Sequence, residues 1–227
     1  MTEKVILFDI NETVLDLRAL DDRFEAVFGD RDVNPLWFAA LLHMSCVATV
    51  TGVKTRFADL AGIALETLAA RRGTLINTSD KTNILEGFAD LAPHKDVTEA
   101  LSLLRAKGYR TIAFTNSSEV LVKNQISNAG LAPLFDRIIS VEKTGQFKPS
   151  AAVYHYAASE INQPIGDLRL IATHDWDTHG ALSAGMKAAY IDRSGAVYNP
   201  LYLKPDIFAA NMVDLAGAII AADNLAP

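Results

Sequence analysis

The chain carries a set of polar residues whose types suit nucleophilic and acid–base chemistry. Asp9 directly follows the hydrophobic run at residues 5–8. Later hydrophobic runs are followed by further groups of this kind, namely Thr115 with Asn116, Lys148, and His174 with Asp177. A carboxylate can act as a nucleophile or a base, and a lysine beside it can offset negative charge. This set of side chains exceeds what packing alone would select.

The hydrophobic runs themselves predict the strands of a parallel sheet. Each run is short and apolar, which is typical of a strand buried on both faces. The predicted strands span residues 5–8, 111–115, 138–140, 170–173 and 189–191. Segments with helix-start or helix-stop signals lie between them, at residues 96–106, 119–129, 150–160 and 177–184. The alternation predicts a Rossmann-like, doubly wound α/β fold, in which catalytic groups gather beyond the carboxyl ends of the strands.

The long interval after the first strand predicts an inserted helical subdomain. It shows no convincing strand, and helical patterns cover residues 18–28, 36–49, 55–60 and 64–72. A loop of this length without structure of its own is improbable in a compact domain. We therefore expect a helical cap at residues 16–92, seated above a core formed by residues 1–15 and 93–227.

Composition limits the classes of partner. The 227 residues are 50% hydrophobic and carry a net charge of −6 without a basic patch, so a small substrate is expected and nucleic acid is not. The one cysteine, Cys46, has aliphatic neighbours and is interpreted as a packing residue, compatible with a reducing cytosol. No signal peptide and no apolar run of membrane-spanning length are apparent, so a cytoplasmic protein without membrane contact is expected.

The polar segments resemble, in order and spacing, the motifs of the haloacid dehalogenase superfamily. The first of them is Phe8-Asp9-Ile10-Asn11-Glu12-Thr13. The resemblance covers the chain outside the cap and implies that Asp9 is a covalent nucleophile. The superfamily contains phosphatases as well as dehalogenases. Its phosphatases place a second acid two residues after the nucleophile to protonate the leaving alcohol, and Asn11 cannot do this.

The last motif favours the dehalogenases as well. In the phosphatase pattern its first acid is a magnesium ligand, and this chain has Thr173 at the matching position. A hydroxyl is a poor replacement for a carboxylate in a site that gathers hard oxygen donors. Asp175 could support a metal only through a local shift. We therefore expect no metal and no cofactor, with magnesium required only under the phosphatase alternative.

The remaining pattern is similar to that of the L-2-haloacid dehalogenases and their haloacetate-hydrolysing relatives. The resemblance implies that Asp9 displaces halide from carbon to form an ester. Water held by Asp177 and Lys148 then attacks the carboxyl carbon of Asp9. Thr115 and Asn116, which precede a helix, are expected to bind the carboxylate of a small anionic substrate, or else simply to cap that helix. Ile10 and Asn11 are expected to line the substrate-binding site.

The chain also departs from the dehalogenase pattern. Where those enzymes carry an arginine on the first long cap helix that holds the leaving halide, this chain has Phe38. His174 replaces an expected amide, and it either donates to substrate or halide or satisfies a carbonyl at the strand end. His43 is a candidate to take over part of the role of the arginine, although a histidine on a mostly apolar helix is more often a core or rim residue.

Three functions follow from these residues. The leading hypothesis is metal-independent hydrolysis of a small 2-haloacid, and the alternative is a magnesium-dependent phosphatase of small phosphomonoesters. The third is an idle relative that binds a metabolite, which would predict loss of the nucleophile or of the lysine, whereas both are present. The resemblance further implies a homodimer.

Overall fold

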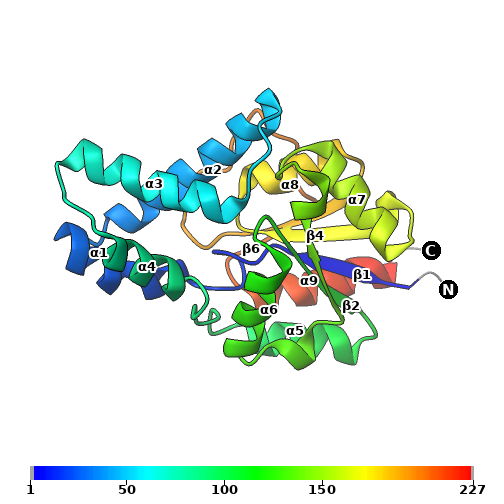
Figure 1. The fold of residues 1–227 in the computed structure, drawn as a ribbon. Helices are drawn as coiled ribbons and strands as arrows, with labels where there is room; N and C mark the ends of the chain where they lie inside the picture. The colour runs from blue at the N-terminus through cyan, green and yellow to red at the C-terminus, as the bar shows by residue number, and fades with distance from the viewer. Residues whose placement is uncertain (1–2, 226–227) are drawn as a thin grey trace.

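The computed structural model describes residues 3–225 and contains one parallel sheet with helices on both of its faces (Figure 1). The strand order is β3-β2-β1-β4-β5-β6, and all neighbouring strands run parallel. The strands are β1 (Val5–Phe8), β2 (Arg110–Thr115), β3 (Arg137–Ser140), β4 (Leu168–Ala172), β5 (Lys187–Ile191) and β6 (Ile207–Ala209). The order reverses direction between β1 and β4, and a doubly wound sheet binds its ligands at such a switch point.

The core helices follow the strands in the predicted alternation. They are α5 (Val97–Ala106), α6 (Glu119–Asn128), α7 (Ala151–Ile161), α8 (Asp175–Ser183) and α9 (Met212–Leu225), with short 3-10 turns at η2 (Ala132–Leu134), η3 (Val141–Thr144) and η4 (Ile165–Asp167). Helices α5, α6 and α9 cover one face of the sheet, and α7 and α8 cover the other (Figure 1). The predicted α/β fold is confirmed. Strand β6 and helix α9 were not predicted, because β6 has only three residues and Phe208 within it is exposed.

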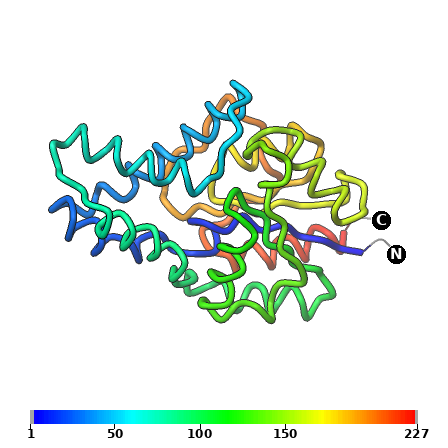
Figure 2. Tube along the Cα trace, in the orientation of Figure 1, coloured from blue at the N-terminus to red at the C-terminus, as the bar shows by residue number. Residues whose placement is uncertain are grey.

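The interval after β1 is helical, as expected. It contains η1 (Leu17–Leu20), α1 (Asp21–Phe28), α2 (Val33–Thr51), α3 (Phe57–Arg72) and α4 (Thr78–Gly87). Figure 2 shows this segment to one side of the sheet. Two helices predicted at residues 55–72 are one, since Gly62 stays within α3. Helix α4 was missed, although Asn77 and Asp80 form a capping box at its start.

The chain leaves and re-enters the core at one place. Leu15 and Pro93 form an antiparallel bridge, and the backbone N–H of Asp16 donates to the carbonyl of Ala92 across 2.8 Å. This crossing supports our assignment of core and cap, with boundaries at residues 16 and 93, which remains a proposal.

Helix α2 forms the centre of the cap and reaches the core. Trp37 is fully buried, packs against Phe24 at 5.4 Å between ring centroids, and donates from Nε1 to the carbonyl of Ala61. Near the other end of the helix, Thr49 accepts a hydrogen bond from the backbone N–H of Phe147. The expectation of no membrane-length apolar segment was wrong, because α2 meets the length and composition of a membrane span. Of the window that meets this test, 39% is buried, including Trp37, Phe38 and Leu41.

Candidate active site

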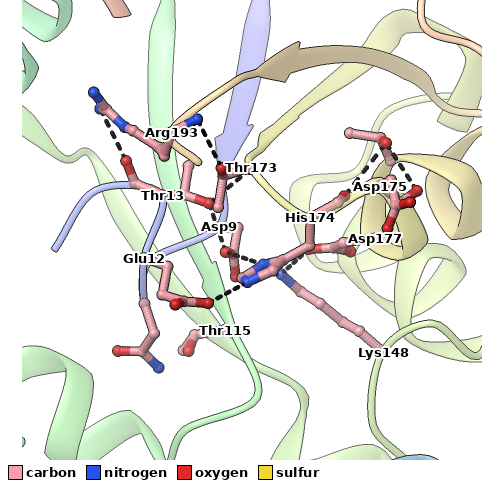
Figure 3. A network of polar contacts seen from close by, with 12 residues as sticks. Asp9, Glu12, Thr13, Thr115, Lys148, Thr173, His174, Asp175, Asp177 and Arg193 are labelled. Carbon is pink, nitrogen blue, oxygen red and sulfur yellow. Dashed lines mark hydrogen bonds and ion pairs between the residues drawn. The ribbon is translucent and has the colours of Figure 1, made fainter. Parts of the chain in front are cut away.

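The predicted polar residues meet at the carboxyl edge of the sheet (Figure 3). Asp9 follows β1, and its backbone N–H continues the pairing by donating to the carbonyl of Ile171. Thr115 ends β2, Lys148 precedes α7 and Asp177 lies in the first turn of α8. All four residues are buried. Parallel strands bring their carboxyl ends to one edge, which is why residues far apart in the sequence form one cluster.

Lys148 links the two carboxylates of the cluster. Its Nζ lies 3.1 Å from Oδ1 of Asp9, 2.9 Å from Oδ2 of Asp177 and 2.9 Å from the carbonyl oxygen of Phe114. The side chain is only 1% exposed. Burial lowers the pKa of Lys148, but the two carboxylates outweigh burial and raise it above its ordinary value. The ammonium is therefore charged, and it offsets the repulsion between two buried acids.

Asp177 has a second partner that the sequence did not reveal. The hydroxyl of Tyr154, on α7, donates to its Oδ1 across 2.6 Å. Burial raises the pKa of Asp177, whereas Lys148 and Tyr154 act in the opposite direction. Gly180 permits this contact, because a Cβ at that position would lie 2.6 Å from the Tyr154 hydroxyl. The one available signal was a tyrosine on the buried face of a helix, since buried tyrosine hydroxyls usually find a partner.

The other oxygen of Asp9 is held by its own loop. The Thr13 hydroxyl donates to Oδ2 across 2.7 Å, and the same hydroxyl oxygen accepts from the backbone N–H of Thr173. Burial raises the pKa of Asp9, but Lys148, His174 and Thr13 outweigh it and hold the pKa well below its usual range. Asp9 is therefore an ionised carboxylate in a buried setting, which is the state that a nucleophile requires.

His174 lies against the nucleophile. Its Nε2 is 2.7 Å from the carboxylate of Glu12, and its Nδ1 is 3.3 Å from Oδ2 of Asp9, an ion-pair contact without the angle of a hydrogen bond. The ring stacks on Trp176, with centroids 5.1 Å apart, and faces Phe38 of the cap. Burial lowers the pKa of His174, but the two carboxylates outweigh it and raise it to about 10. The ring is therefore an imidazolium.

The predicted substrate-binding residues differ in whether their polar groups still have hydrogen-bonding capacity for a ligand. Oγ1 of Thr115 accepts from the backbone N–H of Ser117, and Oδ1 of Asn116 accepts from the backbone N–H of Lys148. Thr115 keeps its hydroxyl proton and Asn116 its amide N–H groups. Asn11, in contrast, donates to the Ser117 hydroxyl and accepts from the side chain of Gln125. Its amide is thus engaged in a buried network between elements, and Ile10 beside it is fully buried.

Phe38 and His43, the two candidate site residues on the cap, have different environments in the structure. Phe38 is 3% exposed and covers His174. His43 is exposed, and its side chain makes no hydrogen bond or ion pair within residues 3–225, so its part in the site stays a prediction. The cause is helical geometry: Leu41 is fully buried, and His43 follows it by two residues, which is about 200° around the helix.

The positions that could hold a metal do not form a suitable donor set. Oδ2 of Asp175 accepts the backbone N–H of Asn199, and Oγ1 of Thr173 accepts the backbone N–H of Arg193. Lys148 places an ammonium between Asp9 and Asp177. Among residues 3–225, no three His, Cys, Asp or Glu side chains are grouped as metal ligands. The residues present therefore do not fit a magnesium ion.

A pocket of about 530 Å³ opens beside the cluster. It lies where the connections to the cap meet the core, and it shares Glu12, Thr173 and His174 with the cluster. The charged side chains of Asp16, Arg18, Asp192 and Arg193 line it, together with the imidazole of His94. A small polar molecule could therefore approach the nucleophile from this side.

The fold and the cluster are those of an α/β hydrolase with a buried carboxylate, the candidate nucleophile, at a sheet switch point and a helical segment beside it. The model of one protein family, described as haloacid dehalogenase-like hydrolase, matches residues 3–168. The chain belongs to this family. The superfamily that its motifs resemble is thus confirmed.

Named relatives match most of the length of the chain. The (S)-2-haloacid dehalogenase H-109 of Pseudomonas putida is 26% identical over 202 residues, which are 88% of this chain and 90% of that one. The haloacetate dehalogenase H-2 of Moraxella sp. (strain B) is 23% identical over 96% of this chain and 98% of its own. An L-2-haloacid dehalogenase structure from Xanthobacter autotrophicus, with chloropropionic acid covalently bound, has a TM-score of 0.88 at 19% identity, covering 96% and 99% of the two chains.

Proposed function

We propose that this chain is a hydrolytic dehalogenase of a small 2-haloacid, either a haloacetate or a 2-haloalkanoate. It converts the substrate to the hydroxy acid and halide through an ester on Asp9. The observation that carries this proposal is the buried row formed by Asp9, Lys148 and Asp177, with an amide at Asn11 in place of a second acid. The names of the relatives and the covalent adduct in the Xanthobacter enzyme support it.

The first step uses Asp9 as the nucleophile. Its carboxylate attacks the carbon that bears the halogen, and the carbon–halogen bond breaks with its electron pair on the halide. The halide needs no proton to leave. Lys148 offsets the repulsion between Asp9, Asp177 and the carboxylate of an anionic substrate.

The second step uses Asp177 as the base. A water molecule beside Asp177 and Lys148 attacks the carboxyl carbon of the Asp9 ester, and its proton passes to Asp177. The Tyr154 hydroxyl remains protonated, because burial and Asp177 raise its pKa well above its ordinary value. It therefore donates to Asp177 throughout and orients that carboxylate.

The substrate carboxylate is assigned to the end of β2. Thr115 can donate its hydroxyl proton and Asn116 its amide N–H, because their oxygens already accept backbone hydrogen bonds. The backbone N–H groups at the start of α6 add the partial positive charge of a helix N-terminus. Ile10 and Phe38 supply apolar walls near Asp9, and Asn11 supports the loop through Ser117 and Gln125.

Metal independence is part of this proposal, and one assay separates it from the phosphatase alternative. Purified protein is incubated with chloroacetate, fluoroacetate, 2-chloropropionate or p-nitrophenyl phosphate, in EDTA or in magnesium. We expect halide release at equal rates in EDTA and magnesium, because Lys148 supplies the positive charge that a metal would otherwise provide. Phosphate release that requires magnesium, without halide release, would contradict the proposal. The absence of both halide and phosphate would indicate a catalytically idle relative.

Replacing Tyr154 with Phe tests the orientation of the base. We expect kcat to fall roughly ten- to a hundredfold, as for the loss of a hydrogen bond to a charged group. The hydrogen bond favours ionised Asp177, so its loss raises the pKa of Asp177 and moves the acid limb of the rate profile to higher pH. Tyr156→Phe is the matched control, because Tyr156 lies on α7 and its hydroxyl makes no hydrogen bond within residues 3–225. An unchanged pH profile for Tyr154→Phe would refute this role.

We also propose that the chain forms a homodimer in the cytoplasm. The half-buried free thiol of Cys46 is compatible with a reducing compartment. Sedimentation equilibrium of the purified chain tests the dimer, and a single species of monomer mass across the micromolar range would exclude it.

A further inference from the structure

We propose that His174, held by Glu12, forms with Thr13 the oxyanion site in which the Asp9 ester is hydrolysed. His174 thereby becomes a catalytic residue of the second step and Glu12 a positioning residue. The inference rests on the proposed function, because it assigns a role in breaking the ester that this function requires.

The two oxygens of Asp9 have different surroundings. Oδ1 faces Nζ of Lys148 at 3.1 Å, on the side of Asp177. Oδ2 is covered by the Thr13 hydroxyl at 2.7 Å and by Nδ1 of His174 at 3.3 Å. Oδ1 is therefore assigned as the attacking oxygen, and Oδ2 becomes the carbonyl oxygen of the ester.

Both groups beside Oδ2 can donate to it. The Thr13 oxygen accepts from the backbone N–H of Thr173, so its own proton points to Asp9. Nε2 of His174 is held by Glu12, and Nδ1 lies between this pair and Asp9, buried without a hydrogen-bond partner within residues 3–225. In an imidazolium placed between two carboxylates, Nδ1 carries a proton that it can donate to an oxygen beside it. The tetrahedral intermediate provides that oxygen, because its negative charge develops on Oδ2.

The hydrolytic step then balances as follows. Water attacks the carboxyl carbon of Asp9, its proton goes to Asp177, and the electron pair of the C=O bond moves to Oδ2. When that pair returns, the bond from the carboxyl carbon to Oδ1 breaks, and the hydroxy acid leaves with Oδ1 and a proton from Asp177. Thr13 and the imidazolium stabilise the negative charge on Oδ2 between these events.

Glu12 is placed for this role at a local conformational cost. Its φ of 66° lies in the left-handed region, which a residue with a side chain seldom adopts. This turn directs the carboxylate to Nε2 of His174 at 2.7 Å, and Glu12 remains 36% exposed at the pocket. Trp176 and Phe38 lie against the ring, with centroids 5.1 and 6.2 Å away. The imidazolium is thus fixed in position and in charge.

Other charged groups around His174 come from every neighbouring element. Asp9 and Glu12 follow β1, Lys148 precedes α7, Asp177 lies in α8, and the shared pocket adds Asp16, Arg18, His94, Asp192 and Arg193. Of these, only Asp9 and Glu12 contact the ring nitrogens. Removing the charge of Glu12 should therefore lower the pKa of His174 and shift the alkaline limb of hydrolysis to lower pH.

The test separates the two chemical steps with chloroacetate and 2-chloropropionate as probes. His174→Leu, which removes the donor, and Glu12→Gln are compared with the wild type for halide released in the first turnover, steady-state rate, and intact protein mass. For His174→Leu we expect a stoichiometric burst of halide, a steady-state rate roughly a hundredfold lower, and an ester that accumulates on Asp9. For Glu12→Gln we expect about a tenfold loss and an alkaline limb at lower pH.

The control and the contrary outcomes are distinct. Asp16→Asn removes the same charge from the same pocket without a hydrogen bond to His174, and it should neither accumulate ester nor move the alkaline limb. Melting curves show whether each variant is folded, and Glu12→Gln keeps the test valid if His174→Leu is not. The inference would be overturned if halide release in the first turnover slowed as much as the steady-state rate and no ester accumulated. It would also be overturned if the steady-state rate did not change. No halide from the wild type would instead overturn the proposed function and the inference with it.

Discussion

Replacing Asp9 with Asn is expected to abolish halide release, by at least about 10⁴-fold, because an amide is a poor nucleophile toward carbon. The substitution keeps the size of the side chain, so Thr13 and Lys148 retain a neighbour of the same shape. The measurements are steady-state halide release and the intact mass of the protein after incubation with 2-chloropropionate. We expect neither turnover nor a covalent adduct.

The matched control for this variant is Asp175→Asn. Asp175 lies in the same cluster region, but its carboxylate faces the backbone N–H of Asn199. Turnover within about threefold of the wild type is expected. If Asp9→Asn turned over at the wild-type rate, another residue would have to be the nucleophile. A selective, magnesium-dependent effect of Asp175→Asn would instead favour the phosphatase alternative.

Replacing Lys148 with Met should have the second-largest effect, on both activity and stability. Two buried carboxylates would then lie close together without the cation between them, and they could not both remain ionised. We expect kcat to fall by at least about 10³-fold, since charge stabilisation is lost in both steps. Breaking a buried ion pair costs roughly 3–5 kcal/mol of unfolding free energy.

The pH dependence of that stability distinguishes lost charge from lost packing. In the wild type, the pKa of Asp9 is lower in the folded than in the unfolded chain. This difference stabilises the fold at pH values above the unfolded pKa, and the stabilisation is lost as the pH falls through the folded pKa. Without Lys148, the pKa of Asp177, which burial already raises in the wild type, rises further in the folded state. Its contribution is then present at low pH and lost as the pH rises.

Urea unfolding at pH 5 and pH 8 provides the measurement. The Lys148→Met variant should lose more stability, relative to the wild type, at pH 8 than at pH 5. Lys143→Met serves as the control, because Lys143 is exposed in the neighbouring turn η3. An equal loss at both pH values would indicate that Lys148 contributes packing alone.

The sequence by itself determined the architecture of the core and the place of its polar groups. Continuous apolar runs indicate strands buried on both faces, and parallel strands bring their carboxyl ends to one edge. These rules depend only on spacing along the chain, so the sequence is enough to place Asp9, Thr115, Lys148 and Asp177 at that edge. The absence of an acid at Asn11 is likewise a property of residue type alone.

Local rules were less successful within the inserted segment. The boundaries of α3 were missed because Gly62 resembles a break in the chain, although neighbouring helices bury the apolar face of one continuous helix. His43 was a candidate for the site because its type suited the chemistry, with a core or rim residue as the alternative. Only the packing of α2, which buries Leu41 and leaves His43 exposed, decides which face of the helix points inward.

The tertiary structure alone decided which side chains pair. Glu12 and His174 are separated by 162 positions, and Tyr154 and Asp177 by 23, yet both pairs lie within hydrogen-bond distance. Residue type could not predict these contacts, because each depends on the relative placement of two elements and on a backbone turn such as that at Glu12. Sequence therefore supplied Asp9, Lys148 and Asp177 as candidates, while folding determined the surroundings, orientation and partners of these side chains.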